Sequence, residues 1–114
     1  MLDLRETVKF EEAKLRSRED QAFRVRSRRN GLLGLWLADR LGLGEKAAAA
    51  CAKRIASASV DHPADEALAR WIARLAASAG VSLDEHTIRA EIDRLGVVAA
   101  LEQGPAALPA AKAA

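Results

Sequence analysis

The feature that most constrains this chain is segment 28–38, Arg-Arg-Asn-Gly-Leu-Leu-Gly-Leu-Trp-Leu-Ala, in which five large apolar residues follow a basic start. Leu33, Leu37 and Leu41 are spaced four apart, so they share one face of a helix, and a second apolar row lies beside them. A helix that is apolar over so wide an arc must be covered on more than one side. The pattern therefore predicts the central helix of a small bundle, over residues 21–41.

Two further helices are expected directly after this one. The alanine-rich segment 45–60 has an apolar side that includes Cys51, which we expect to be a small buried hydrophobe. Proline suits the first turn of a helix, so the next helix is predicted to begin at Pro63, with Asp61 or His62 as its cap.

The remaining boundaries follow from glycine and from a capping pattern. Gly80 is expected to end the third helix, and Ser82 with Glu85 is a capping box that would begin the fourth. Gly104 is expected to stop the fourth helix, and residues 104–114 are predicted to be a disordered tail because they are rich in Ala and Pro. The predicted core comprises Leu33, Trp36, Leu37, Trp71, Leu75, Ile88, Ile92 and Leu95.

The first 20 residues differ from the rest of the chain. Residues 1–30 hold nine Lys/Arg and six Asp/Glu, a net charge of +3, whereas residues 31–114 have a net charge of −1. Leu4, Val8 and Leu15 form only a narrow apolar stripe, which gives a helix little to bury against its own core. We therefore expect residues 1–20 to be a mobile arm that can become helical, ahead of a four-helix bundle at residues 21–103.

Several classes of function lack their usual residues in this sequence. A single cysteine and two histidines offer no zinc-binding spacing, and neither a GxxxxGK[ST] phosphate loop nor a GxGxxG motif is present. No apolar run approaches the roughly 20 residues of a membrane span, and the charged N-terminus does not look like a signal peptide. These features favour a soluble intracellular binding or regulatory module over an enzyme, with no metal and no insertion into a membrane.

One long motif resembles the signature of a known family. The motif consists of Phe23, Arg28, Arg29, Asn30, Leu32, Leu33, Gly34, Leu35 and Trp36, residues that we also expect to contribute to the core of the bundle. It is similar to the signature of the zeta subunit family, small inhibitors of the F-type ATP synthase in alphaproteobacteria. The likeness extends upstream to Arg5-Glu6 and 10–14, and downstream to 85–89, and it departs from the family at Gly31, where a lysine is usual.

The resemblance implies an all-α four-helix bundle whose N-terminal arm becomes helical and enters an interface between catalytic and non-catalytic subunits, near the rotor. There the arm would block ATP hydrolysis by contacting the alpha, beta and gamma subunits. The arm residues implicated are Leu4, Arg5, Glu6, Val8, Phe10, Glu11, Lys14 and Leu15. The free protein would be a cytoplasmic monomer, peripheral at the inner face of the plasma membrane when bound. The family also implies weak adenine nucleotide binding on the bundle, for which no residues are identifiable here; no other cofactor is expected.

Two alternatives of other classes remain open at this point. The first is a basic helical module that binds nucleic acid through Arg24, Arg26, Arg28 and Arg29, although no recognised reading-helix motif accompanies these arginines. The second is a structural helical module that dimerises through its alanine-rich faces.

Overall fold

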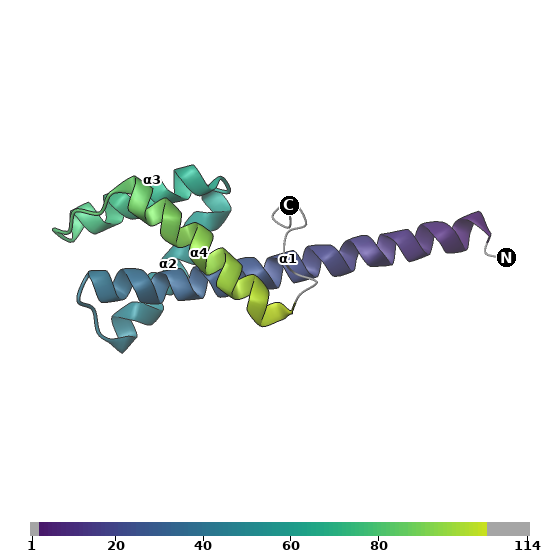
Figure 1. The fold of residues 1–114 in the computed structure, drawn as a ribbon, viewed down its shortest axis with the longest axis horizontal. Helices are drawn as coiled ribbons and strands as arrows, with labels where there is room; N and C mark the ends of the chain where they lie inside the picture. Colours follow the sequence, from purple (N-terminus) through teal and green to yellow (C-terminus); the bar gives the residue numbers. More distant parts are fainter. Residues whose placement is uncertain (1–2, 105–114) are drawn as a thin grey trace.

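The computed structural model describes residues 3–104, and this part of the chain consists of four α-helices without a strand. The helices are α1 (Leu4–Arg40), α2 (Glu45–Asp61), α3 (Asp65–Ser78) and α4 (Glu85–Gln103). The molecule is elongated, with principal extents of 64 × 31 × 23 Å. Figure 1 shows why: α1 is a long rod, and the other three helices gather around its C-terminal half. The all-α fold and the four helices predicted from the sequence are confirmed.

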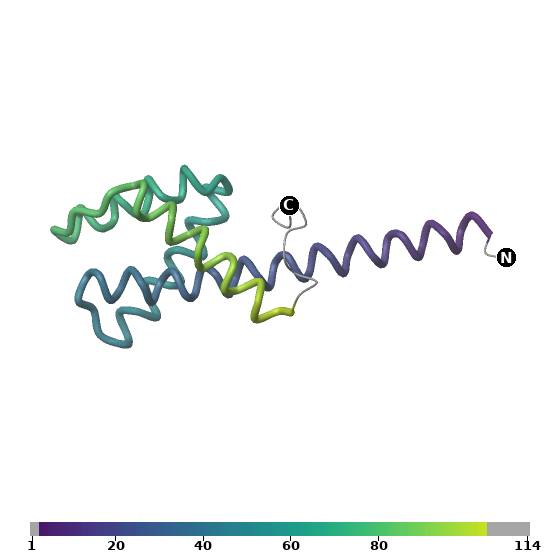
Figure 2. The backbone as a smooth tube through the Cα atoms, in the orientation of Figure 1, coloured from purple at the N-terminus to yellow at the C-terminus, as the bar shows by residue number. Residues whose placement is uncertain are grey.

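The long helix α1 has two parts with different surroundings. Residues 3–20 are all exposed, and burial begins only at Gln21. In the tube view of Figure 2, the N-terminal half of α1 extends away from the other helices. We call residues 3–20 the arm. It is helical in this structure and continues into the packed half of α1 without a break.

The core lies where the second half of α1 meets the other helices. α1 packs mainly against α2 and α4, and α3 packs against α4. The largest fully buried side chains are Leu33, Leu37, Ile55, Leu68, Ile72, Ile88 and Ile92. Of the predicted core, the leucines of α1 and the three apolar residues of α4 are buried, whereas Trp36, Trp71 and Leu75 are partly buried and pack against this cluster.

A close approach of backbones joins α1 to α2. At Gly34, an added Cβ would lie 2.4 Å from Ala52 Cα and 2.6 Å from its Cβ, which is closer than real contacts allow. At Gly31, by contrast, an added Cβ would meet nothing within 4 Å. Gly34 therefore has a packing role that Gly31 does not share.

Glycine follows the end of two helices, at Gly42 after α1 and, as the sequence predicts, at Gly80 after α3. Gly42 and Gly80 both have positive φ, at +69° and +78°. After α1, the N–H of Gly42 donates to Asp39 O and the N–H of Leu43 donates to Ala38 O, at 3.1 and 2.9 Å. This pair of bonds is a Schellman motif, which satisfies carbonyls that the helix end would otherwise leave without a partner.

Two predicted helix starts are wrong. α3 begins at Asp65 with Ala64 as its N-cap, so neither Asp61 nor His62 caps it and Pro63 precedes its first turn. Asp61 is instead the last residue of α2. The reason is that α2 continues beyond the predicted end at residue 60, so Asp61 belongs to α2 and cannot cap α3.

At α4, the N-cap is Asp84, whose Oδ2 accepts from the Thr87 N–H at 3.2 Å. The predicted capping box from Ser82 to Glu85 therefore does not form. Asp ranks with Ser as an N-cap, so a sequence with both leaves the position ambiguous. The end of α4 at Gly104 agrees with the prediction, whereas the rest of the predicted tail, 105–114, lies outside the described residues.

Candidate functional site

The arm begins with a well-made helix cap. Asp3 Oδ1 accepts from the Glu6 N–H at 2.8 Å, and Thr7 Oγ1 donates to Asp3 O at 3.0 Å. Glu6 also places a negative charge in the first turn, where it interacts favourably with the helix dipole. These contacts favour a helical arm although its side chains have no core to pack against.

Four large apolar side chains of the arm are exposed to solvent. Leu4 is 80 % exposed, Phe10 58 %, Leu15 54 % and Val8 47 %. Lys14 lies over the Phe10 ring at 5.3 Å from the ring centroid. The expectation that the arm has little to bury against its own core is therefore confirmed.

The apolar stripe of the arm is in phase with the core face of α1. Leu33 follows Leu15 by 18 residues, which is about five full turns of a helix. Leu33 also follows Leu4, and Leu37 follows Val8, by 29 residues, or about eight turns. The stripe therefore faces the same side of α1 as the residues that are buried in the bundle.

Two signature arginines join the packed half of α1 to α3 and α4. Arg28 Nε donates to Glu102 Oε2 of α4 at 2.7 Å, and Glu102 raises the pKa of the Arg28 guanidinium. Arg29 Nη1 donates to Asp65 Oδ1 at the start of α3, at 3.1 Å. The Arg28 pair is exposed, but the Arg29 side chain is only 12 % exposed, so the second pair is the better shielded from solvent.

The third signature residue is buried and takes part in the same network. Asn30 is 6 % exposed, and its Oδ1 accepts from both Arg29 Nε and Nη2, at 3.3 and 3.1 Å. Asp65 is also 3.8 Å from Arg89 Nη2 of α4, which in turn pairs with Glu66. The network therefore joins α1, α3 and α4 at one point, nine residues after the arm ends at residue 20.

The apolar part of the signature divides between core and surface. Leu33 and Gly34 are buried, and Leu32 and Trp36 are partly buried. The assignment of Leu35 and Phe23 to the core is wrong: Leu35 is 55 % exposed and Phe23 is 62 % exposed. Leu35 faces away from the neighbouring helices because apolar residues cover a wider arc of α1 than α2 and α4 do. Phe23 lies too early in α1 to reach the core.

The profile of one protein family, described as ATPase inhibitor subunit zeta, matches residues 1–102. The chain belongs to this zeta family. The match includes both the arm and the bundle, so the two are parts of one zeta-family protein. No curated protein and no solved structure matches the chain. Within the described residues, the helices are all too polar or too short to cross a membrane.

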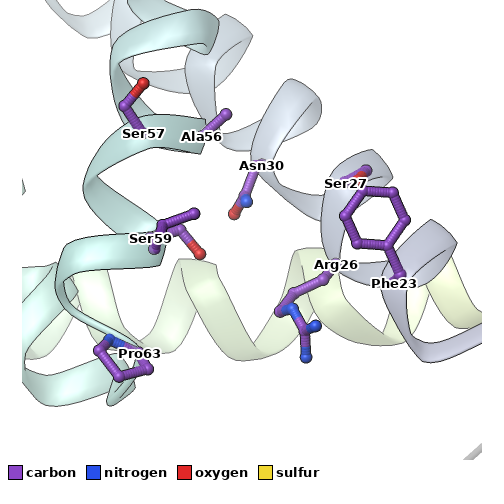
Figure 3. A pocket seen from close by; sticks show the side chains of 9 residues that line it. Phe23, Arg26, Ser27, Asn30, Ala56, Ser57, Ser59 and Pro63 are labelled. Atoms are coloured by element: carbon purple, nitrogen blue, oxygen red, sulfur yellow. The ribbon is translucent and has the colours of Figure 1, made fainter. Parts of the chain in front are cut away.

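The structure also shows a groove that the sequence did not reveal. It has a volume of about 650 Å³ and lies between α1 and the C-terminal half of α2. Its lining is Phe23, Arg26, Ser27, Asn30, Ala56, Ser57, Ser59, Val60 and Pro63. In Figure 3 the α1 side chains lie on one side and those of α2 and Pro63 on the other, with the Asn30 amide directed between them. We call this feature the α1–α2 groove.

In the part of this zeta-family chain that the structure describes, neither Cys51 nor the potential metal ligands have the surroundings of a reactive site. Cys51 is buried in the core, and burial raises the pKa of its thiol, which opposes formation of the nucleophilic thiolate. Its predicted role as a small buried hydrophobe is therefore confirmed. Among residues 3–104, three or more His, Cys, Asp or Glu side chains do not come together in a way that could hold a metal ion.

The sequence indicated the arm and the signature, but not the acidic residues that the signature arginines bind. Asp65 and Glu102 are 36 and 74 residues away from the arginines they bind, and a single sequence gives no sign of such pairs. The only available hint was that acidic residues are common in the first turn of a helix, where Asp65 lies.

Proposed function

We propose that this chain inhibits ATP hydrolysis by the F-type ATP synthase by inserting its arm, as a helix, at a catalytic subunit interface near the rotor. The partner surfaces would belong to the alpha, beta and gamma subunits, and the bundle would remain outside as a docking body. The complex would lie at the inner face of the plasma membrane. Membership of the zeta family supports the inhibitory role.

The observation that carries the proposal is the exposure of the whole arm. All of residues 3–20 are exposed, including four large apolar side chains that are costly to leave in water. A surface of this kind is typical of a segment that gains its contacts from a partner, in which a few anchors supply most of the binding energy.

The continuity of α1 favours insertion of the arm as a helix. Starting a helix in isolation is unfavourable, and isolated helices shorter than about 12–15 residues are marginal in water. Here the packed half of α1 supplies the nucleus, and the arm only has to extend it. The entropic cost of ordering on binding is therefore smaller than for a separate flexible segment.

The nucleic-acid alternative loses support from the ion pairs. Of the four arginines on which it rests, Arg28 and Arg29 are bound to Glu102 and Asp65 within the bundle. Only Arg24 and Arg26 remain for phosphates, and two contacts give weak binding at physiological salt.

The test is steady-state ATP hydrolysis by ATP synthase depleted of its inhibitor, with purified variants added back. The key variant changes Leu4, Val8, Phe10 and Leu15 to Ser together, which retains the charges of the arm. We expect the variant to melt like the unmodified chain, because these side chains bury little, but to lose inhibition. Deletion of residues 1–15 should have the same effect.

The matched control replaces exposed apolar residues of the bundle, Leu43→Ser and Leu101→Ser, which are 42 % and 58 % exposed. This control should inhibit normally. Full inhibition by the fourfold serine variant in low salt would indicate an electrostatic contact in place of the apolar one. Full inhibition by the deletion variant would reject arm insertion altogether.

A further inference from the structure

The α1–α2 groove carries two exposed apolar side chains at its rim. Val60 of α2 is 80 % exposed and Phe23 of α1 is 62 % exposed, and both line the groove. Pro63 continues the apolar lining at the end of α2, while the buried Asn30 amide lies between the two helices (Figure 3). A concave surface with large apolar side chains and a few polar groups has the composition of a site for a helix or peptide.

The groove also has an unpaired positive charge. Arg26 lines it and makes no ion pair within residues 3–104, although Arg28 and Arg29, two and three positions later, are both paired. A guanidinium left free beside an apolar surface can bind a carboxylate in a bidentate manner. The chemistry of the groove therefore favours an occupant with apolar side chains and at least one Asp or Glu.

The groove begins at Phe23, eight residues after the apolar stripe of the arm ends at Leu15. Arg26 follows Leu15 by 11 residues, or about three helical turns, so both lie on the same side of α1. From Leu4 to Arg26 the axial distance is about 33 Å at 1.5 Å per residue. A partner that covers the stripe would therefore meet the groove if it continued along the same side of the helix.

We propose that the α1–α2 groove is a second docking site for the ATP synthase, which receives a peptide segment of the enzyme with apolar side chains against Phe23 and Val60 and a carboxylate against Arg26. This inference rests on the proposed function and deepens it. The arm would block the enzyme, and the groove would hold the bundle against the same assembly and slow dissociation.

The test uses full-length chains and measures the concentration that gives half-maximal inhibition of ATP hydrolysis. The groove variants are Arg26→Glu and Val60→Lys, at exposed positions where a change should leave the fold intact. The matched controls are Arg24→Glu, on the same helix but outside the groove, and Leu101→Lys, an exposed apolar residue of α4. Thermal melts of all four should agree with that of the unmodified chain.

We expect each groove variant to raise the half-inhibitory concentration by about tenfold or more, and the controls to change it by less than about threefold. The defect of Arg26→Glu should shrink when the salt concentration is raised from about 0.05 to 0.5 M, because charge interactions are screened. The defect of Val60→Lys should respond less to salt, because it comes largely from the loss of an apolar contact.

The outcomes separate the two proposals. If the unmodified chain inhibits and the arm serine variant does not, but the groove variants behave like their controls, the docking site is refuted and the proposed function stands. If the unmodified chain does not inhibit, both fall. Sedimentation at several concentrations tests whether a second copy of the chain occupies the groove instead. A dimer of the unmodified chain that Val60→Lys converts to a monomer would show that it does, and would overturn the proposal.

Discussion

The close contact between α1 and α2 at Gly34 gives the sharpest test of the packing. In Gly34→Ala the new Cβ would lie 2.4 Å from Ala52 Cα and 2.8 Å from Ala52 N, both of which are backbone atoms of α2. These atoms cannot turn aside as a flexible side chain would, so the two helices must separate. Overpacking of a tight core costs typically 1–3 kcal/mol, and we take about 3 kcal/mol here because backbone has to move.

Helix propensity acts in the opposite direction and must be subtracted. Replacing a helical glycine by alanine gains about 1 kcal/mol, which leaves a net loss of about 2 kcal/mol for Gly34→Ala. Gly31→Ala is the matched control, three residues away in the same helix, where the new Cβ meets nothing within 4 Å. It should gain the full propensity term and stabilise the protein by about 1 kcal/mol.

The two variants should therefore differ by about 3 kcal/mol, or roughly 12–24 °C in melting temperature for a domain of this size. Far-UV circular dichroism during thermal and urea unfolding measures the difference directly. If Gly34→Ala melts at or above the temperature of Gly31→Ala, the close approach of α1 and α2 does not exist in solution. Gly31→Lys should also be tolerated, because an added Cβ at this position meets nothing within 4 Å.

Three further predictions concern the ion pairs and the arm. Arg29→Ala should lower the free energy of unfolding by about 1–3 kcal/mol in urea titrations, because it leaves partly buried acceptors without a donor, whereas Arg28→Ala should cost less because its pair is exposed. The pKa of Glu66 is lowered by its own backbone N–H and by Arg89, so its contribution to stability should be complete above the pKa that Glu66 has in the unfolded chain and be lost as the pH falls further; Glu66→Gln should remove that part of the acid dependence of the melting temperature. Amide exchange should be faster over residues 3–18 than in the packed half of α1, and equal protection would refute the separation of arm and bundle.

The helices themselves could be predicted from the sequence because their apolar residues repeat with the helical period. Leu33 and Leu37 on α1, and Ile88 and Ile92 on α4, are fully buried as this period requires. Where apolar residues are too numerous for the period to decide, the prediction was wrong: Leu35 has the same character as its neighbours, yet it is exposed. Only the positions of the other helices determine which part of a wide apolar arc is covered.

Local capping was harder to predict for a different reason. Ser82 and Asp84 are both good N-caps, and a sequence offers no way to choose between candidates two residues apart. The polar network was beyond sequence reasoning altogether, because Arg29 meets Asp65 only after α2 has turned the chain back toward α1. The α1–α2 groove was missed for the same reason, since its two walls come from separate helices.

These contacts change how the family signature of this zeta protein should be interpreted. Arg28, Arg29 and Asn30 are engaged within the bundle, and Gly34 is required by the approach of α2, so these residues stabilise the fold and hold the packed half of α1 in place. The surface that we propose for a partner lies elsewhere, in the arm and at the rim of the α1–α2 groove. Substitutions in the signature should therefore change stability first and inhibition only as a consequence. Substitutions in the arm should change inhibition while the bundle remains folded, because no core contact depends on them.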